Sequence, residues 1–169
     1  DEIVPLLQHC LYDLNSAAPS IDTPLHGLLP FPHIDHLHPD ALIAIAAAKD
    51  GEAIMKQIWG DSIAWIPWQR PGFDLGLQLE KCYKDNPDIK GIILGSHGLF
   101  TWGNTSKECY FNSLTVIEEA SIFLAKAQEK KGSIFGGLKI ESPTSPYRLS
   151  QAAQLMPILR GLCSEKNQM

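Results

Sequence analysis

The order of its apolar segments is the feature that most restricts the fold of this chain. Short strand-like runs alternate with longer segments in which apolar residues recur every three or four positions, the spacing of a helix with one buried face. Strands that alternate with helices predict a layered domain, α/β or α+β, in which helices cover a sheet. The segments expected to form strands are residues 33–38, 63–68, 89–94 and 98–103.

Helices are expected before, between and after these strands. The longest should run from Thr105 to Lys131, because it starts with an N-cap threonine and ends in lysines, the arrangement that the helix dipole favours. Thr23-Pro24 predicts the N-cap and first turn of a short helix that leads to Leu29. The other helices are expected at about residues 2–14, 41–48, 51–59, 75–86 and 149–163.

Composition and charge exclude several classes of protein. The 169 residues are the size of one domain, and an apolar content of 44% is enough for a packed core. Fourteen basic and nineteen acidic residues leave a net charge of -5, which argues against nucleic acid or anionic membranes as partners. The sequence shows neither a membrane span nor a signal peptide, so a cytoplasmic protein is expected. Its four cysteines lie far apart without a CxxC pair and are interpreted as free thiols.

Three histidines could bind a metal ion. His36 and His38 are two positions apart, so on a strand they project from the same face with Cα atoms about 7 Å apart. His33 and Asp35 would point the other way and are not counted as ligands. His97 offers a third ligand from a glycine-flanked turn after strand 89–94. Three histidines and one open position are typical of catalytic zinc, although iron, cobalt, nickel or manganese would also be accepted.

The same histidines also have a simpler interpretation. A His-x-His pair often arises by chance, and a single histidine after a strand is more commonly a hydrogen-bonded core residue. Spacing alone therefore leaves a shared metal site and ordinary packing both open. By the same reasoning, His9 and His26 are interpreted as packing or capping residues.

Three segments in a fixed order resemble the class II aldolase/adducin family. They are PSIDTPLH at 19–26, HLHP at 36–39 and LGSHGLFTWG at 94–103. The stretch WIPWQRPGF at 65–73 makes the chain more narrowly similar to the aldolase part of bifunctional rhamnulose-1-phosphate aldolase/alcohol dehydrogenases. The resemblance extends from about Asn15 to Gly137, and the order of the motifs makes it specific.

The resemblance implies a fold, a metal and a reaction. The implied fold is a three-layer α/β/α sandwich on a mainly antiparallel central sheet, usually assembled as a homotetramer. His36, His38 and His97 would hold Zn2+ or another divalent transition metal. The implied reaction cleaves a phosphorylated ketose, L-rhamnulose 1-phosphate, to dihydroxyacetone phosphate and L-lactaldehyde through an enediolate that the metal stabilises. Family relatives leave open a sugar-phosphate epimerase, a decarboxylase or a non-catalytic, adducin-like assembly module.

Proton transfer in such a reaction needs a carboxylate near the metal. Aldolases of the family place a glutamate upstream of the histidine pair, and Asp22 occupies the corresponding position here. Asp22 could instead cap the helix that begins near Thr23. Family members also use a tyrosine late in the chain, and no motif assigns that role to Tyr110 or Tyr147.

The family's phosphate-binding loop has no counterpart in this sequence. Residues 1–18 contain no glycine, and the stretch GNTS at 103–106 is interpreted as the cap of the long helix. No GxGxxG dinucleotide fingerprint follows the tail either. The sequence therefore predicts a partial domain: a class II aldolase-like domain over residues 1–137, and a helical tail or linker over 138–169 that leads towards an absent dehydrogenase domain.

Overall fold

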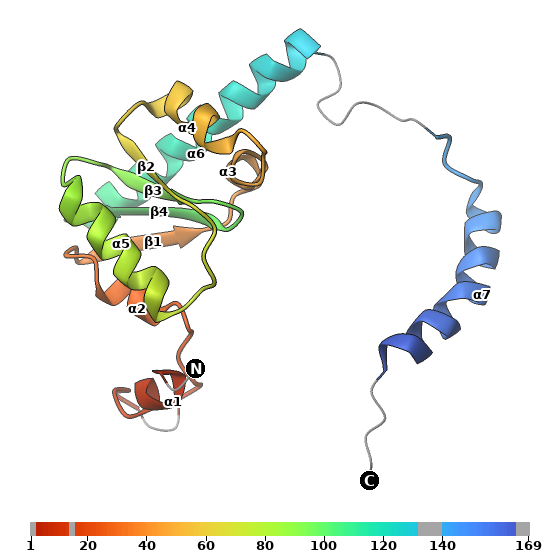
Figure 1. Ribbon diagram of the computed structural model, residues 1–169, viewed down its shortest axis with the longest axis horizontal. Helices are drawn as coiled ribbons and strands as arrows, with labels where there is room; N and C mark the ends of the chain where they lie inside the picture. Colours follow the sequence, from red (N-terminus) through yellow and green to blue (C-terminus); the bar gives the residue numbers. More distant parts are fainter. Residues whose placement is uncertain (1–2, 14–15, 132–139, 165–169) are drawn as a thin grey trace. The chain divides into compact units, whose positions relative to one another are not determined.

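The computed structural model describes residues 3–13, 16–131 and 140–164 (Figure 1). The chain divides into two compact units, Asp1–Lys130 and Lys131–Met169. The first unit contains a sheet with helices packed on it. The second contains the helix α7 (Ser145–Cys163), none of whose side chains is buried. The predicted domain boundary after residue 137 and the glycines at 132, 136 and 137 lie outside the described residues.

In the part of the chain that the structure describes, four strands form one sheet in the order β1-β4-β3-β2. Both β1 and β3 are antiparallel to β4, whereas β2 is parallel to β3. The sheet is therefore mixed, which corrects the prediction of a mainly antiparallel sheet. The parallel pair arises because a helix joins β2 to β3, and such a crossover returns the chain in its original direction. The strands are β1 (His33–Leu37), β2 (Ile63–Ile66), β3 (Gly91–Leu94) and β4 (Gly98–Gly103).

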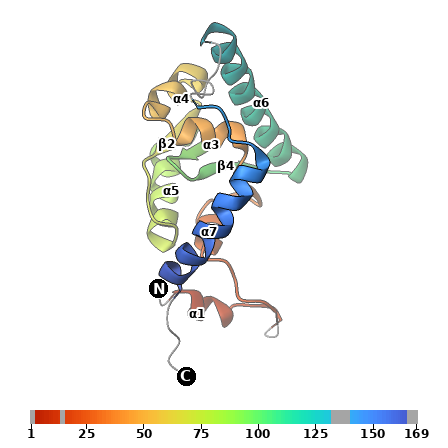
Figure 2. The ribbon, with the colours of Figure 1, turned by 90° about the vertical axis from the view of Figure 1, so that its right-hand side faces the viewer.

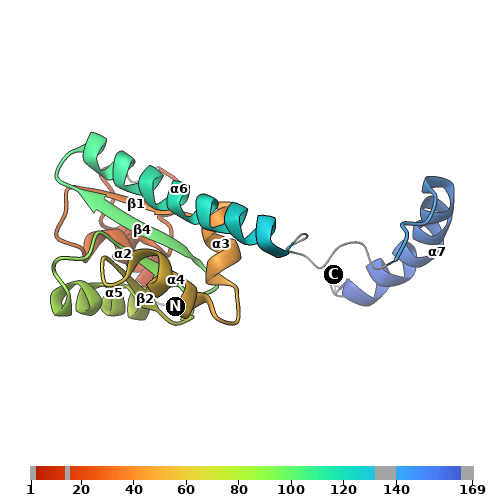
Figure 3. The ribbon, with the colours of Figure 1, turned by 90° about the horizontal axis from the view of Figure 1, so that it is seen from above.

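Helices cover both faces of the sheet. On one face lie α2 (Thr23–Gly27) and α5 (Phe73–Asp85). The other face is covered by α3 (Asp40–Ala46), α4 (Gly51–Trp59) and α6 (Ser106–Lys131). Figure 2 shows α5 and α6 on opposite sides of the strands, and Figure 3 shows α6 running along the sheet. The result is a helix–sheet–helix arrangement of three layers.

The two central strands divide the core between these layers. Every residue of β3 and β4 is buried, as expected for strands covered on both faces, which read as continuous apolar runs. Ile92 and Phe100 pack towards α2 and α5, while Ile93 and Leu99 pack towards α3, α4 and α6. Strand alternation thus gives each helical layer its own apolar cluster.

The elements have the predicted types, with one large difference in length. The first helix, α1, spans Ile3–Gln8 rather than 2–14. Helices shorter than about 12–15 residues are marginal in water without tertiary packing. The described side chains of α1 are mostly exposed, so no packing extends it.

Two further sequence expectations concern the cysteines and the helices. Cys10, Cys82, Cys109 and Cys163 are all free thiols in the structure, which confirms their interpretation. Within the described residues, no helix combines the length and apolar character that crossing a bilayer requires.

Candidate metal centre

The antiparallel pairing of β1 with β4 positions the first two histidines. His36 lies opposite Phe100, and the two rings are stacked with centroids 4.2 Å apart and an interplanar angle of 10°. Asp35, the preceding residue, points to the other face of the sheet, where Ser113 Oγ of α6 donates a hydrogen bond to it over 2.8 Å. His38 follows the end of β1 and is exposed. Strand alternation therefore separates Asp35 from the histidines, as the sequence predicts.

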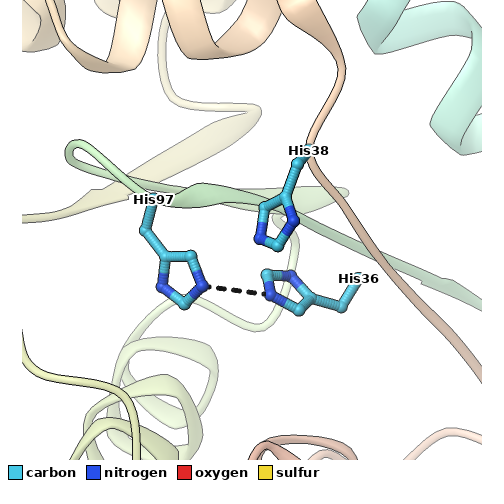
Figure 4. A group of neighbouring side chains, drawn as sticks. All are labelled: His36, His38 and His97. Carbon is cyan, nitrogen blue, oxygen red and sulfur yellow. Dashed lines mark hydrogen bonds between the residues drawn. The ribbon is translucent and has the colours of Figure 1, made fainter. Parts of the chain in front are cut away.

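His97 lies in the turn that joins β3 to β4. The N–H of His97 donates to the carbonyl of Leu94 over 3.1 Å, and the N–H of Ser96 donates to the carbonyl of Ala46 over 2.8 Å. Ser96 has a φ of 54°, which among the described residues makes it the one non-glycine in the left-handed region. These constraints turn the chain sharply and direct His97 towards the other two histidines (Figure 4).

Gly98 leaves the space that the imidazole rings of β1 need. A Cβ atom at this position would lie 2.6 Å from Cδ2 of His38 and 2.7 Å from the carbonyl oxygen of Leu37. Both separations are far inside van der Waals contact. Any side chain at position 98 would therefore push the histidine segment away from β4.

The three imidazoles converge on one point (Figure 4). One ligand nitrogen from each of His36, His38 and His97 lies within 4.8 Å of the other two. The Nε2 atoms of His36 and His97 are 3.2 Å apart. In a tetrahedral zinc site with Zn–N bonds of about 2.0–2.1 Å, two ligand nitrogens lie about 3.3 Å apart. The spacing fits a single divalent cation.

The hydrogen bonds of the rings also suit a metal ion. Nδ1 of His36 donates to the carbonyl of Leu99 over 3.2 Å, so the neutral ring presents the lone pair of Nε2. Without a cation, the contact between the two Nε2 atoms requires a proton from His97. Nδ1 of His97 would then be an acceptor, and this buried atom has no partner among the described residues. A cation between the nitrogens removes the need for that shared proton.

The environment keeps the rings in the neutral form that binds metals. Burial lowers the pKa of His36 to about 4; the Leu99 carbonyl opposes this shift, while His97 and His38 add to it. Burial also lowers the pKa of His97, with a further contribution from His38. At neutral pH no proton therefore has to leave these two rings before a cation binds.

Asp22 acts electrostatically on His36 and His97 but does not cap its helix. It occupies the N-cap position of α2, yet its side chain makes no capping hydrogen bond, so the structure does not support the capping interpretation. Its Oδ1 is buried without a hydrogen-bond partner among the described residues. Its negative charge raises the pKa values of His36 and His97, against the effect of burial. A carboxylate oxygen without a partner among the described residues is thus close enough to the histidines to affect their pKa values.

One residue near the site is missed by sequence reasoning. His26 is exposed on α2, with its ring centroid 6.5 Å from that of His36 and 5.6 Å from that of Phe100. The signal that could have revealed it is its position four residues after Asp22, which places both on one face of a helix. The candidate tyrosines are elsewhere: Tyr110 is on α6, across the sheet from His36, and Tyr147 is in the second unit.

Comparisons with known proteins identify the family of this chain. The family described as "Class II Aldolase and Adducin N-terminal domain" matches residues 4–124. A curated relative, the uncharacterized oxidoreductase YuxG of Bacillus subtilis (strain 168), is 37% identical over all 169 residues of this chain, which correspond to 24% of that protein. The chain therefore spans about a quarter of the length of this relative.

Solved structures show the same fold. The N-terminal class II aldolase domain of a conserved protein from Thermoplasma acidophilum superposes with a TM-score of 0.66 at 31% identity, over 72% of this chain and 56% of that one. A sugar-phosphate aldolase from Thermotoga maritima superposes with a TM-score of 0.55 over 72% of this chain and 59% of its own. Its identity is 18%, so that likeness concerns the fold alone.

Proposed function

Because this chain belongs to the class II aldolase and adducin family, we propose that it is the metal-binding part of a lyase that cleaves a phosphorylated ketose. The family resemblance and the class II aldolase-like fold predicted from the motifs are confirmed. The observation that carries the proposal is the convergence of three imidazoles, together with a buried carboxylate oxygen of Asp22 that has no hydrogen-bond partner among the described residues. By resemblance of the motifs, the proposed substrate is L-rhamnulose 1-phosphate and the proposed metal is Zn2+.

In this proposal His36, His38 and His97 hold the cation. When bound, the cation supplies Lewis-acid polarisation of the substrate carbonyl, so no lysine Schiff base is needed. The Leu99 carbonyl keeps the His36 ring oriented with Nε2 towards His97. Burial keeps the ring neutral, with its one proton on Nδ1, so the ligand form is present before substrate arrives.

In the proposed reaction, Asp22 accepts one proton from the substrate and later returns it. Its carboxylate accepts the proton of the substrate hydroxyl on the carbon that becomes the aldehyde. The carbon–carbon bond then breaks, L-lactaldehyde leaves, and the electron pair passes towards the polarised carbonyl. Asp22 returns the proton to the carbon that remains, which yields dihydroxyacetone phosphate. The support for this role is the buried Oδ1 atom, which has no other partner among the described residues.

Metal content and product release test the proposal together. After expression with added zinc, the wild type should carry about one zinc per chain, and His97→Ala should lose most of it. His9→Ala, which changes an exposed histidine outside the site, should keep the wild-type zinc content. L-Lactaldehyde should appear when zinc-loaded protein meets L-rhamnulose 1-phosphate, and Asp22→Asn should slow its release at unchanged zinc content.

Three outcomes separate the alternatives. A wild type without stoichiometric transition metal contradicts the proposed mechanism. Zinc uptake without lactaldehyde release would point instead to an epimerase or decarboxylase of the same family. Assembly into an oligomer without zinc uptake would favour a structural module. We also propose that the active form is a homotetramer, which sedimentation of the zinc-loaded protein can measure.

A further inference from the structure

Helix α2 brings two chemically active side chains to the three-histidine centre. Asp22 at the N-cap and His26 within α2 are four residues apart, a spacing of about one helical turn that places both on the same side of the helix start. The charge of Asp22 acts on His36 and His97. The ring of His26 lies edge-on to His36, with an interplanar angle of 69°. The start of α2 therefore lies beside the three-histidine centre.

His26 is not one of the metal ligands. The group whose nitrogens approach one another within 4.8 Å consists of His36, His38 and His97. Ring centroids 6.5 Å apart are also too distant for a direct hydrogen bond between His26 and His36. The separation leaves room for an oxygen atom of a bound ligand, which would accept a hydrogen bond of about 2.9 Å from a ring nitrogen of His26.

The His26 ring is oriented but unpaired. It contacts the ring of Phe100, which is itself stacked on His36, so one aromatic side chain supports both imidazoles. His26 is exposed and makes no hydrogen bond with the residues that the structure describes. An imidazole carries at least one N–H donor in every protonation state. A donor therefore lies near the site, and no residue of the described chain receives it.

We propose that His26 binds the substrate, donating a ring N–H to an oxygen of a polyhydroxylated, phosphorylated ligand held at the three-histidine centre. The inference rests on the proposed function, because that function supplies the class of ligand. A ketose phosphate carries hydroxyl and phosphate oxygens along its whole length, so one of them can reach His26 while the carbonyl end is at the centre. In this proposal Asp22 transfers the proton and His26 binds the ligand.

The competing interpretation is that His26 only packs against Phe100. Two substitutions distinguish the roles. His26→Phe keeps an aromatic ring against Phe100 but removes the N–H donor, whereas His26→Asn keeps an N–H donor but removes the ring. His33→Phe is the matched control, because His33 is an exposed histidine of β1 whose position alternates to the opposite face of the sheet from His36.

The experiment measures binding of dihydroxyacetone phosphate to the zinc-loaded full chain by isothermal titration calorimetry, with zinc content determined for every variant. We expect His26→Phe to raise Kd about tenfold, the effect of losing one hydrogen bond. His26→Asn should stay within about threefold of the wild type, and His33→Phe should match the wild type. Zinc content should be the same in all four proteins.

Each other outcome has a defined meaning. If His26→Phe binds dihydroxyacetone phosphate as tightly as the wild type, the inference is wrong and the proposed function is untouched. If His26→Phe loses zinc together with the ligand, His26 supports the metal centre and the inference is also wrong. A wild type that binds no dihydroxyacetone phosphate overturns both proposals. Binding that depends on His26, without release of lactaldehyde, supports the inference and contradicts the proposed reaction.

Discussion

His36 is the most restricted residue of the candidate metal centre. Its ring is stacked on Phe100, its Nδ1 donates to the Leu99 carbonyl, and its Nε2 faces His97. Burial lowers its pKa from 6.5 to about 4. A proton and a metal cation compete for the same Nε2 atom, so a low pKa favours the cation.

This pKa predicts how the stability of the metal-free protein depends on pH. Between pH 6.5 and 4 the unfolded chain binds a proton at His36 that the folded chain does not, so the free energy of unfolding decreases as pH falls through this range. The full shift corresponds to about 3 kcal/mol. Because the ring is only half-buried, we expect a loss of about 1–2 kcal/mol. Urea unfolding at pH 7 and pH 4.5 measures it.

The variant His36→Asn serves as the control for this prediction. It removes the titrating ring, so its stability should depend less steeply on pH between 6.5 and 4 than that of the wild type. Equal slopes for the two proteins would show that other groups cause the acid sensitivity.

At the scale of elements, the meeting of β1 and β4 is what assembles the centre. His36 and His97 are 61 positions apart in the sequence. The strand period alone predicts that His36 and His38 share a face, because alternation is a local property of the backbone. The register that puts His36 opposite Phe100 depends on pairing between distant segments, and no local pattern specifies it.

Other features of the sheet and of the site could not be predicted from the sequence for similar reasons. The direction of β2 against β3 cannot be read from short apolar runs, which look alike in parallel and antiparallel sheets. Aspartate is suited both to capping and to catalysis. Only the structure shows that the side chain of Asp22 makes no capping hydrogen bond. The role of His26 depends on its contacts with Phe100 and His36, which the sequence does not specify.

The close approach of β4 to β1 gives a second prediction. In Gly98→Ala the new methyl group would overlap His38 and the Leu37 carbonyl, so either the ring turns away or the strands separate. We expect zinc affinity to fall at least about tenfold, and the free energy of unfolding to fall by about 1–3 kcal/mol. Competition with a chelating dye measures the affinity. Gly27→Ala is the control, because a Cβ at Gly27 meets no atom within 4 Å; an equal effect there would contradict the steric argument.

A series of hydrogen-bonded side chains between the sheet and α6 gives a third prediction. Thr101 Oγ1 and Ser113 Oγ are 2.6 Å apart, and Ser113 donates to Asp35 on β1. Thr101 and Ser113 are buried, so Ser113→Ala would leave polar atoms without partners. We expect the free energy of unfolding to fall by about 1–3 kcal/mol. Thermal melts should show no such loss for Ser121→Ala, which removes an exposed hydroxyl from the same helix; similar losses in both would contradict the prediction.

At the scale of the whole molecule, burial divides the chain unevenly. The first unit contains both apolar clusters of the sheet, while α7 has no buried side chain and carries Pro157 in its interior. The predicted metal ligands and Asp22 all belong to the first unit. The candidate chemistry therefore depends on residues before Lys131.

This division predicts the effect of truncation. A chain that ends at Lys130 should keep the zinc content of the full chain and a melting temperature within about 3 °C of it, since none of the side chains of α7 is buried. Differential scanning calorimetry and metal analysis of the two chains make the comparison. A large drop in melting temperature would show that the helix contributes to the stability of the first unit.

Gly98 has a consequence for how this centre can diversify among descendants of one ancestral gene. A side chain of any size at position 98 collides with the imidazole rings, so only glycine fits at this point of β4. His26 is exposed, and its ring lies against the side chains of His36 and Phe100, so a replacement there does not meet the backbone overlap found at Gly98. Changes in what this centre binds should therefore arise by replacement of exposed residues such as His26, while Gly98 stays unaltered.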